Sequence, residues 1–175
     1  MKKKIIPIIL LMMIGLLASC GETSYDPAEI SMESDQCHTC YMGIEDLEAA
    51  SQTLLADGTP RIFDDIGCML MYLQDTTDDV EVSYVVDYNS GDWNDLSNAY
   101  FVHDESIQTP MSYGFIAFSS EQEAEEYMTA SGQGNLFTSD EITAIDTASL
   151  EEWYRGHSEE RHGEDEEHED DGNDA

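Results

Sequence analysis

Two cysteines, a histidine and a methionine lie within a single short segment, Cys37-His38-Thr39-Cys40-Tyr41-Met42. Thiolate and thioether sulfur atoms are soft donors, and soft donors favour Cu(I) over hard cations such as Mg²⁺ or Ca²⁺. A structural zinc site would normally need four nitrogen or sulfur ligands, and the sequence contains no second C-x-x-C pair. The segment therefore predicts a metal site that favours Cu(I), with Cys37, Cys40, Met42 and the imidazole of His38 as candidate ligands.

Cys68 is a further thiol, predicted in the first turn of a helix, where the helix N-terminus would lower its pKa and favour the thiolate. His103, at the end of a predicted strand, is a second imidazole candidate. If Cys20 serves another purpose, three cysteines remain, and an odd number in an exported chain argues against a complete disulfide framework. The alternative is a structural or redox disulfide between Cys37 and Cys40, with Cys68 as a core residue.

The first half of the chain supplies the elements that must position these thiols. Residues 49–55 and 61–63 are predicted strands with a D-G-T-P turn between them. Asp64 and Asp65 then supply helix N-cap chemistry. Apolar residues follow at the period of a helix that faces a core: Ile66, Met69, Leu70 and Leu73. Residues 80–88 form the third predicted strand.

The second half repeats this plan. Residues 99–103 and 113–118 are predicted strands, and Ser120 with Glu123 fits a capping box for a following helix. Glycines at 132 and 134 end that helix, and residues 135–138 form a closing strand. The order β-β-α-β therefore occurs twice. It predicts an α+β fold in which two packed β-β-α-β units form one small domain.

The N-terminus predicts export and lipid anchoring. Three lysines precede an apolar stretch, residues 5–17, that is too short for a membrane span and is typical of a secretory signal. Leu17-Ala18-Ser19-Cys20 resembles a bacterial lipobox, which implies that Cys20 carries acyl chains such as palmitate and begins the mature protein. An ordinary cleavable signal is the alternative. We therefore expect a lipoprotein of the cell envelope, extracytoplasmic and held on an inner or outer membrane.

Composition divides the rest of the chain. Residues 1–19 are the predicted signal peptide, 20–35 a flexible tether, 36–155 the copper-binding domain and 156–175 a disordered acidic tail. The tail carries three histidines, which could weakly collect Cu(II), Ni(II) or Zn(II) or could simply lie in a solvated extension: His157, His162 and His168.

The formal net charge of −33 limits the kinds of molecule that the protein can bind. Such a surface repels nucleic acid and anionic membranes, so neither is an expected partner of the domain itself. High ionic strength in a salt-rich habitat would screen this charge, and cation collection is the competing explanation. The sequence offers no recognisable catalytic constellation or phosphate-binding glycine loop, so we predict a protein that is not an enzyme.

Three motifs in order resemble the NosL family. They are Cys37-x-x-Cys40-x-Met42, the run from Phe63 to Met69, and Thr109-Pro110-Met111 followed by residues 114–118. The family comprises lipoproteins associated with copper-site assembly in nitrous oxide reductase, described as small α/β domains of paired β-β-α-β units. The resemblance implies Cu(I) ligands at Cys37, Cys40, Met42 and Met111, and, from a form of the second motif found in some members, at Cys68.

These observations predict a membrane-anchored, extracytoplasmic Cu(I) metallochaperone that serves nitrous oxide reductase maturation in denitrification. Its partner would be the apo-reductase or an ABC-type maturation complex. One alternative is a thiol-disulfide oxidoreductase that uses Cys37 and Cys40 on a copper-protein partner. A second alternative is an acidic lipoprotein with a structural disulfide and only a binding or scaffolding role.

Overall fold

The computed structural model describes residues 24–146 and 148, which fold into two small antiparallel sheets with three α-helices and a short 3-10 helix. In chain order the elements are β1 (Ser51–Leu55), β2 (Pro60–Phe63), α2 (Ile66–Asp75), β3 (Val80–Val86), β4 (Trp93–Asp95), η2 (Leu96–Asn98), β5 (Tyr100–His103), β6 (Phe115–Phe118), α3 (Glu121–Ser131), β7 (Asn135–Thr138) and α4 (Ser139–Thr143). The predicted α+β class and the repeated β-β-α-β order are both confirmed.

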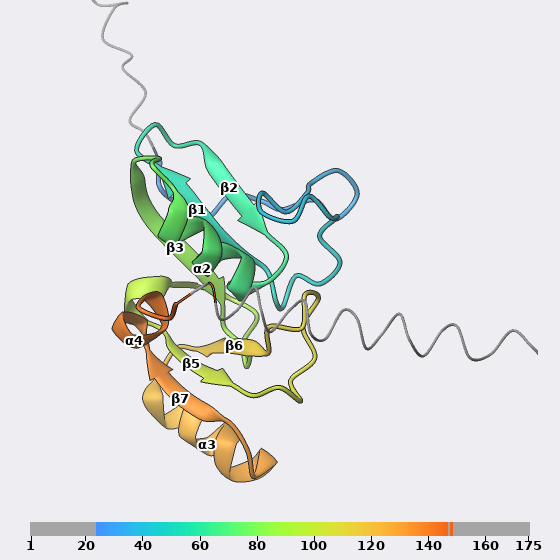
Figure 1. Ribbon diagram of the computed structural model, residues 1–175, viewed down its shortest axis with the longest axis vertical. Helices are drawn as coiled ribbons and strands as arrows, with labels where there is room; N and C mark the ends of the chain where they lie inside the picture. The colour runs from blue at the N-terminus through green and yellow to red at the C-terminus, as the bar shows by residue number, and fades with distance from the viewer. Residues whose placement is uncertain (1–23, 147, 149–175) are drawn as a thin grey trace, which may run out of the picture.

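In the first unit, β1 is a central strand in a sheet of order β2-β1-β3-β4, and α2 lies across the sheet (Figure 1). Every residue of β1 is buried. The segment before β1 also contacts the sheet, because the Gln52 side chain accepts a hydrogen bond from Ala28 N at 2.7 Å and donates one to Ala28 O at 3.2 Å. Residues assigned to the tether by composition thus lie against the domain from residue 25 onward, where Tyr84 Oη donates to Tyr25 O at 2.9 Å.

In the second unit, β5 is the central strand of a sheet of order β6-β5-β7, and α3 packs beside β7 (Figure 1). The Ser120 hydroxyl caps α3 by accepting from Glu123 N at 3.4 Å, and Gly132 ends the helix in the left-handed conformation, with φ 75°. The complete capping box lies instead at Thr138 and Glu141, where it begins α4. The sequence analysis did not predict α4, which is only five residues long.

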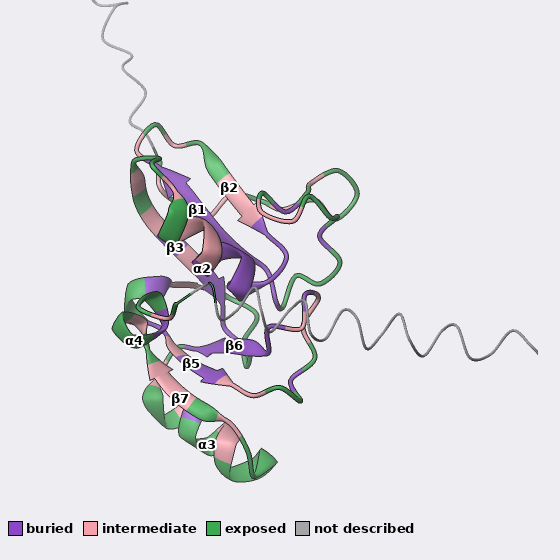
Figure 2. Ribbon diagram, in the orientation of Figure 1, coloured by how far each residue is buried: buried purple, intermediate pink, exposed green. Residues whose placement is uncertain are grey.

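The two sheets are joined where β3 ends. Asp87 and Ala117 form an isolated parallel bridge, and Tyr88 N donates to Ala117 O at 2.8 Å. A single hydrophobic core crosses this joint, with Phe63 and Val85 from the first unit and Phe101 and Phe115 from the second. Buried residues concentrate in β1, β5, β6 and the first half of α2, whereas α3 is mostly exposed (Figure 2). The two units therefore form one domain.

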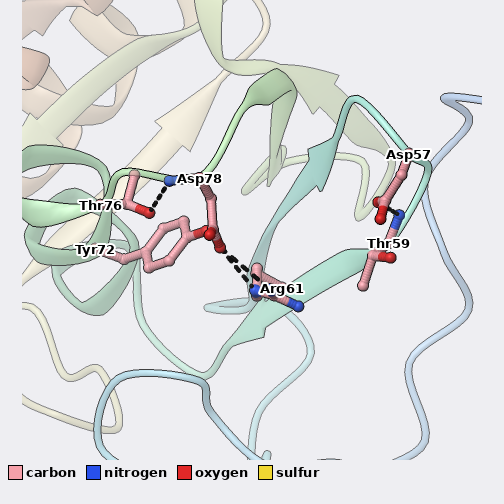
Figure 3. A network of polar contacts seen from close by, with 6 residues as sticks. All are labelled: Asp57, Thr59, Arg61, Tyr72, Thr76 and Asp78. Carbon is pink, nitrogen blue, oxygen red and sulfur yellow. Dashed lines mark hydrogen bonds and ion pairs between the residues drawn. The ribbon is translucent and has the colours of Figure 1, made fainter.

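The described surface is strongly acidic, and Arg61 is the only lysine or arginine between residues 24 and 146. Its guanidinium donates to the Asp78 carboxylate, with Nη2 at 3.1 Å, and Tyr72 Oη donates to the same oxygen at 2.7 Å (Figure 3). Exposed ion pairs of this kind contribute little to stability. None of the helices in the described range is long and apolar enough to cross a membrane.

Gly67, at the start of α2, packs closely against the second unit, so a substitution there tests how tightly the two units are packed. A Cβ atom on Gly67 would clash with the side chain of Tyr113, a buried residue of the second unit. We expect Gly67→Ala to lower the free energy of unfolding by about 1–3 kcal/mol, because overpacking a dense core forces side chains from their preferred positions. Gly43→Ala is the control, since nothing lies within 4 Å of its added Cβ. Urea unfolding of both variants measures the difference, and equal stabilities would contradict this account.

Candidate metal centre

Four side chains from three parts of the chain converge at one end of the first unit. The sulfur atoms of Cys37, Cys40 and Cys68 and a carboxylate oxygen of Asp64 all lie within 4.8 Å of one another. We call these four residues the cysteine cluster. Cys37, Cys68 and Asp64 are buried, and Cys40 is partly exposed. These three cysteines are free thiols, so the Cys37–Cys40 disulfide that the sequence left open as an alternative is not formed in this structure.

A tight turn holds Cys37 and Cys40 in place. Cys37 N donates to Met42 O at 2.8 Å, and Tyr41 N donates to Cys37 O at 3.0 Å. Tyr41 adopts the left-handed conformation with φ 63°, which closes the turn and leaves its side chain 75% exposed. Backbone strain of this kind is unusual for a bulky residue and is often found beside binding sites. The turn thereby directs two sulfur atoms of an i, i+3 pair toward the same point.

Two hydrogen bonds attach this turn to the β2–α2 connection. His38 N donates to Ile62 O at 2.8 Å, and the Thr39 hydroxyl donates to Cys68 O at 2.9 Å. Asp64 follows β2 directly, and Cys68 lies in the first turn of α2. The turn, the strand end and the helix start therefore meet, and this meeting assembles the cysteine cluster.

The thiols of Cys37 and Cys40 are acidic. A hydrogen bond from Cys68 lowers the pKa of Cys37 to about 6 against the opposing effect of burial. The same donor lowers the pKa of Cys40 to about 7. Thiolates are the metal-binding form of cysteine. At neutral pH, the pair is therefore largely prepared to bind a metal ion.

The predicted activation of Cys68 is wrong. Its thiol donates to the sulfur atoms of Cys37 and Cys40 and is buried, and these effects raise its pKa instead of lowering it. The hydrogen bonds to the two neighbouring sulfur atoms and burial outweigh the effect expected of the helix N-terminus. Burial, followed by the contact with Cys37, likewise raises the pKa of Asp64 to about 7. A cation entering the cluster would offset this concentration of negative charge.

The second aspartate of the pair ties Met111 to the same region. Asp65 caps α2 by accepting from Gly67 N at 2.9 Å. Its other carboxylate oxygen accepts from the Thr109 hydroxyl at 2.6 Å and from Met111 N at 3.1 Å. Met111 is 4% exposed and belongs to the same core as Cys37 and Cys68. The loop between β5 and β6 is thus fixed to the helix that carries Cys68.

The remaining predicted ligands lie elsewhere. Met42 is 46% exposed, beside Tyr41 on the surface. The His38 ring packs edge-on against Tyr72, with centroids 5.3 Å apart, and its nitrogen atoms do not belong to the cysteine cluster. His103 stacks on Phe115 at the far sheet. The lipid-anchor cysteine, Cys20, and the tail histidines lie outside the described residues, so those assignments stay predictions.

Asp64 is the member of the cluster that the sequence analysis missed. The sequence showed two consecutive aspartates before a helix and assigned both to capping. Only Asp65 caps the helix, whereas Asp64 has a different neighbourhood, with its oxygens 3.5 and 3.6 Å from Cys40 Sγ. The spacing D-x-x-x-C from Asp64 to Cys68 was the available signal, because it places a carboxylate just before the helix N-cap and a thiol in the first turn.

Thiol alkylation can check this order of reactivity. At pH 7, we expect iodoacetamide to modify Cys40 at least about tenfold faster than Cys68, because Cys40 is partly exposed and partly thiolate. The Cys40 rate should rise with pH, reach half of its maximum near the Cys40 pKa of about 7, and level off above it. Time-resolved peptide mass spectrometry of the reduced protein measures each rate. A Cys68 rate equal to that of Cys40 would contradict the hydrogen-bond order within the cluster.

Comparison with known proteins gives three results. The family model described as NosL matches residues 27–146. The crystal structure of the copper chaperone NosL from Shewanella denitrificans superposes with a TM-score of 0.58 at 22% sequence identity, covering 69% of this chain and 98% of that chain. No curated protein matches. At this identity, the structural likeness shows a shared fold.

Proposed function

The chain belongs to the NosL family, and we propose that it is a copper chaperone that binds one Cu(I) ion through Cys37, Cys40 and Cys68. The observation that carries the proposal is the convergence of three free thiols, together with the Asp64 carboxylate, within 4.8 Å at the edge of the hydrophobic core, where Cys37 and Cys68 are buried. Thiolates are the preferred ligands of Cu(I). A member of a family of copper chaperones is not expected to be an enzyme.

The exposure of the cluster suits a metal that must be passed on. Cys37 and Cys68 are each 1% exposed, whereas Cys40 is partly exposed and is followed by the exposed side chains of Tyr41 and Met42. An incoming sulfur ligand from a partner would reach the ion from the Cys40 side. We propose that transfer begins with exchange of Cys40, while Cys37 and Cys68 hold the ion in place.

Met42 and Met111 are proposed as accessory sulfur ligands. Met42 is exposed and follows Cys40 by two residues, so its thioether could hold the ion during transfer, and Met111 is buried in the same core as Cys37 and Cys68. Neither residue is needed for the three-thiol site. His38 remains a candidate metal ligand on the basis of the sequence alone.

The sequence motifs and the family resemblance support a proposal for the location and the recipient of the protein. We propose that acyl chains on Cys20 anchor it to a membrane outside the cytoplasm. The proposed recipient is nitrous oxide reductase or its ABC-type maturation complex, in line with the family resemblance. The strongly acidic domain suits a recipient surface that carries basic residues around its own copper ligands.

An anaerobic titration tests the function. The reduced full chain would be titrated with Cu(I) against a chromophoric competing chelator, beside a variant in which Cys37, Cys40 and Cys68 are all serine. The triple variant subtracts binding by other parts of the chain, including the histidine-containing tail. We expect one tight Cu(I) site that is absent from the triple variant. Identical titrations of the two proteins would overturn the proposal.

The same samples address the oxidoreductase alternative. That reading requires Cys37 and Cys40 to cycle between dithiol and disulfide, and a thioredoxin-like pair normally opens a helix after a strand. Here the pair lies in an irregular turn and Cys37 is buried. A chain that fails to compete for Cu(I) but equilibrates with glutathione at a defined potential would favour the alternative.

Met111 allows a separate prediction with a matched control. We expect Met111→Leu to weaken Cu(I) binding roughly 3- to 10-fold, as loss of an accessory donor would, while hardly changing stability, because Leu and Met have similar volumes. Met69→Leu makes the same substitution at a residue that is also buried in the core. Chelator competition and thermal unfolding measure both effects. If Met69→Leu and Met111→Leu had equal copper affinities, Met111 would be a core residue only.

A further inference from the structure

We infer that residues 149–155 of this chain fold back onto the domain and dock in a groove between α2 and the turn that carries Cys40, with Trp153 and Tyr154 as the anchoring side chains. This segment lies outside the described residues and inside the range 36–155 that composition assigns to the domain. The inference does not rest on copper binding, because its argument and its test both concern the metal-free chain.

The groove combines aromatic, thioether and carboxylate side chains. It measures about 450 Å³, within the size range of clefts that hold a ligand. Its lining includes His38, Tyr41, Met71, Tyr72 and Asp75. The side chain of Tyr41 is 75% exposed, and exposed apolar surface gathered in a groove often marks an interaction site. Thr39 and Tyr41, the two neighbours of Cys40, both line the groove, so an occupant would also hinder access to that thiol.

The described chain leaves the domain close to this groove. Ile145 packs against the core, and its carbonyl oxygen accepts from Gln74 Nε2 at 3.3 Å. Gln74 lies on α2 directly before Asp75 and three residues after Met71, and both of these residues line the groove. One helical turn rises about 5.4 Å, whereas the residues from Ile145 to Trp153 span about 12 Å even when helical. The segment is therefore long enough to reach the groove.

The sequence around the segment fits an amphipathic helix. The Asp146 carboxylate accepts from Ala148 N at 3.0 Å, which is the contact of a helix N-cap residue. Leu150, Trp153 and Tyr154 follow at i, i+3 and i+4, a spacing that gathers apolar side chains on one face of a helix. Amphipathic helices commonly bind by laying this face into an apolar groove. The segment thus carries the surface that the groove would accept.

Charge favours this occupant. The groove includes the carboxylate of Asp75, and the guanidinium of Arg61 is already paired with Asp78. Arg155 is the first lysine or arginine after Arg61 in the sequence, and it directly follows the two aromatic residues. A guanidinium is attracted both to a carboxylate and to the faces of aromatic rings. The segment therefore brings apolar surface and a positive charge to an acidic, aromatic groove.

The two tryptophans of the chain, Trp93 and Trp153, allow a direct test. In the full chain with Trp93→Phe, all tryptophan emission comes from Trp153. We expect acrylamide to quench this emission roughly threefold more slowly in the native, reduced protein than in urea, because a docked side chain keeps at most about 30% of its surface accessible. The quenching rate should not depend on protein concentration, since the contact lies within one chain.

Two further variants locate the docking site. Tyr41→Gly removes an exposed ring from the groove and suits the left-handed backbone at that position. Combined with Trp93→Phe, it should return the native quenching rate toward the rate in urea. Trp153→Ala should raise the rate at which iodoacetamide modifies Cys40 roughly threefold, because the cover over the groove is lost. Trp93→Phe alone is the matched control, since Trp93 lies in β4 and does not line the groove, so the Cys40 rate should stay unchanged.

Three results would overturn the inference. Native quenching as fast as quenching in urea would place Trp153 in solvent and leave the groove to another molecule. Protection of Trp153 that grows with protein concentration would place the segment on a second copy of the chain. Protection that Tyr41→Gly leaves unchanged, or a Cys40 rate that Trp153→Ala leaves unchanged, would place the segment away from the groove. Because no metal is present in these measurements, failure of the copper proposal in the chelator titration is a separate result.

Discussion

Replacing Cys68 by serine is expected to weaken Cu(I) binding by roughly 100-fold or more, beyond the usual 10- to 100-fold cost of an outer-shell change at a metal site. Cys68 is 1% exposed, and its thiol shares hydrogen bonds with both other sulfur atoms of the cluster. Without it, only the Cys37–Cys40 pair remains, and the deep side of the site is lost. Chelator competition on the reduced full chain measures the change.

Stability controls are needed because Cys68 belongs to the core. Cys68→Ala removes the sulfur without adding a polar group, so it should lose copper affinity to the same extent as the serine variant. Both variants should keep a cooperative thermal transition. If Cys68→Ala retained wild-type affinity, the site would consist of Cys37 and Cys40 with methionine ligands, and the three-thiol site would be wrong.

The largest expected effect on stability is at Asp87, which joins the two sheets. One carboxylate oxygen accepts from the backbone amides of Asn89 and Ser90 and from the Ser90 hydroxyl, and the other accepts from the amide and hydroxyl of Ser119 at 2.6 Å each. Asp87 is 2% exposed. Because Asp87→Ala strands several donors, we expect it to lower the free energy of unfolding by about 3 kcal/mol or more.

The effect of Asp87 should depend on pH in a defined direction. Burial alone would raise the pKa of Asp87, but hydrogen bonds from Ser119 and Ser90 outweigh it and hold the pKa below the ordinary 3.8. A lowered carboxyl pKa contributes stability above the ordinary value and loses it as the pH falls through the pKa of the folded state. The stability difference between wild type and Asp87→Asn should therefore be constant from pH 5 to 7, about one unit and more above the ordinary value, and shrink below it.

Asp57→Asn provides the control for this experiment. Asp57 also accepts from a backbone amide, Thr59 N at 2.9 Å, but in an exposed turn (Figure 3). Water can replace that interaction, so the change in stability should be small. Urea unfolding followed by circular dichroism compares the variants across the pH range. Equal effects at Asp57 and Asp87 would show that the joint between the sheets is not a major source of stability.

Local sequence signals determined much of the fold. Turn residues, helix caps and apolar period each act over a few residues, so the strands near 51–55 and 135–138 and the helix after Asp65 could be predicted where they occur. The repeated β-β-α-β order followed from these elements. The short elements β4 and α4 were not predicted, because three to five residues carry little periodicity and depend on the packing around them.

The metal centre shows what sequence and structure each contributed. The sequence by itself identified Cys37, Cys40 and Cys68 as candidate donors, because thiol chemistry belongs to the residue type and C-x-x-C spacing is local. Only the tertiary structure brought Cys68 close to Cys37 and Cys40. This contact raises the pKa of Cys68 instead of lowering it, because two neighbouring sulfur atoms outweigh the effect of a helix terminus. Only the structure separated Asp64 from its neighbour Asp65, because adjacent side chains at a helix start face different surroundings.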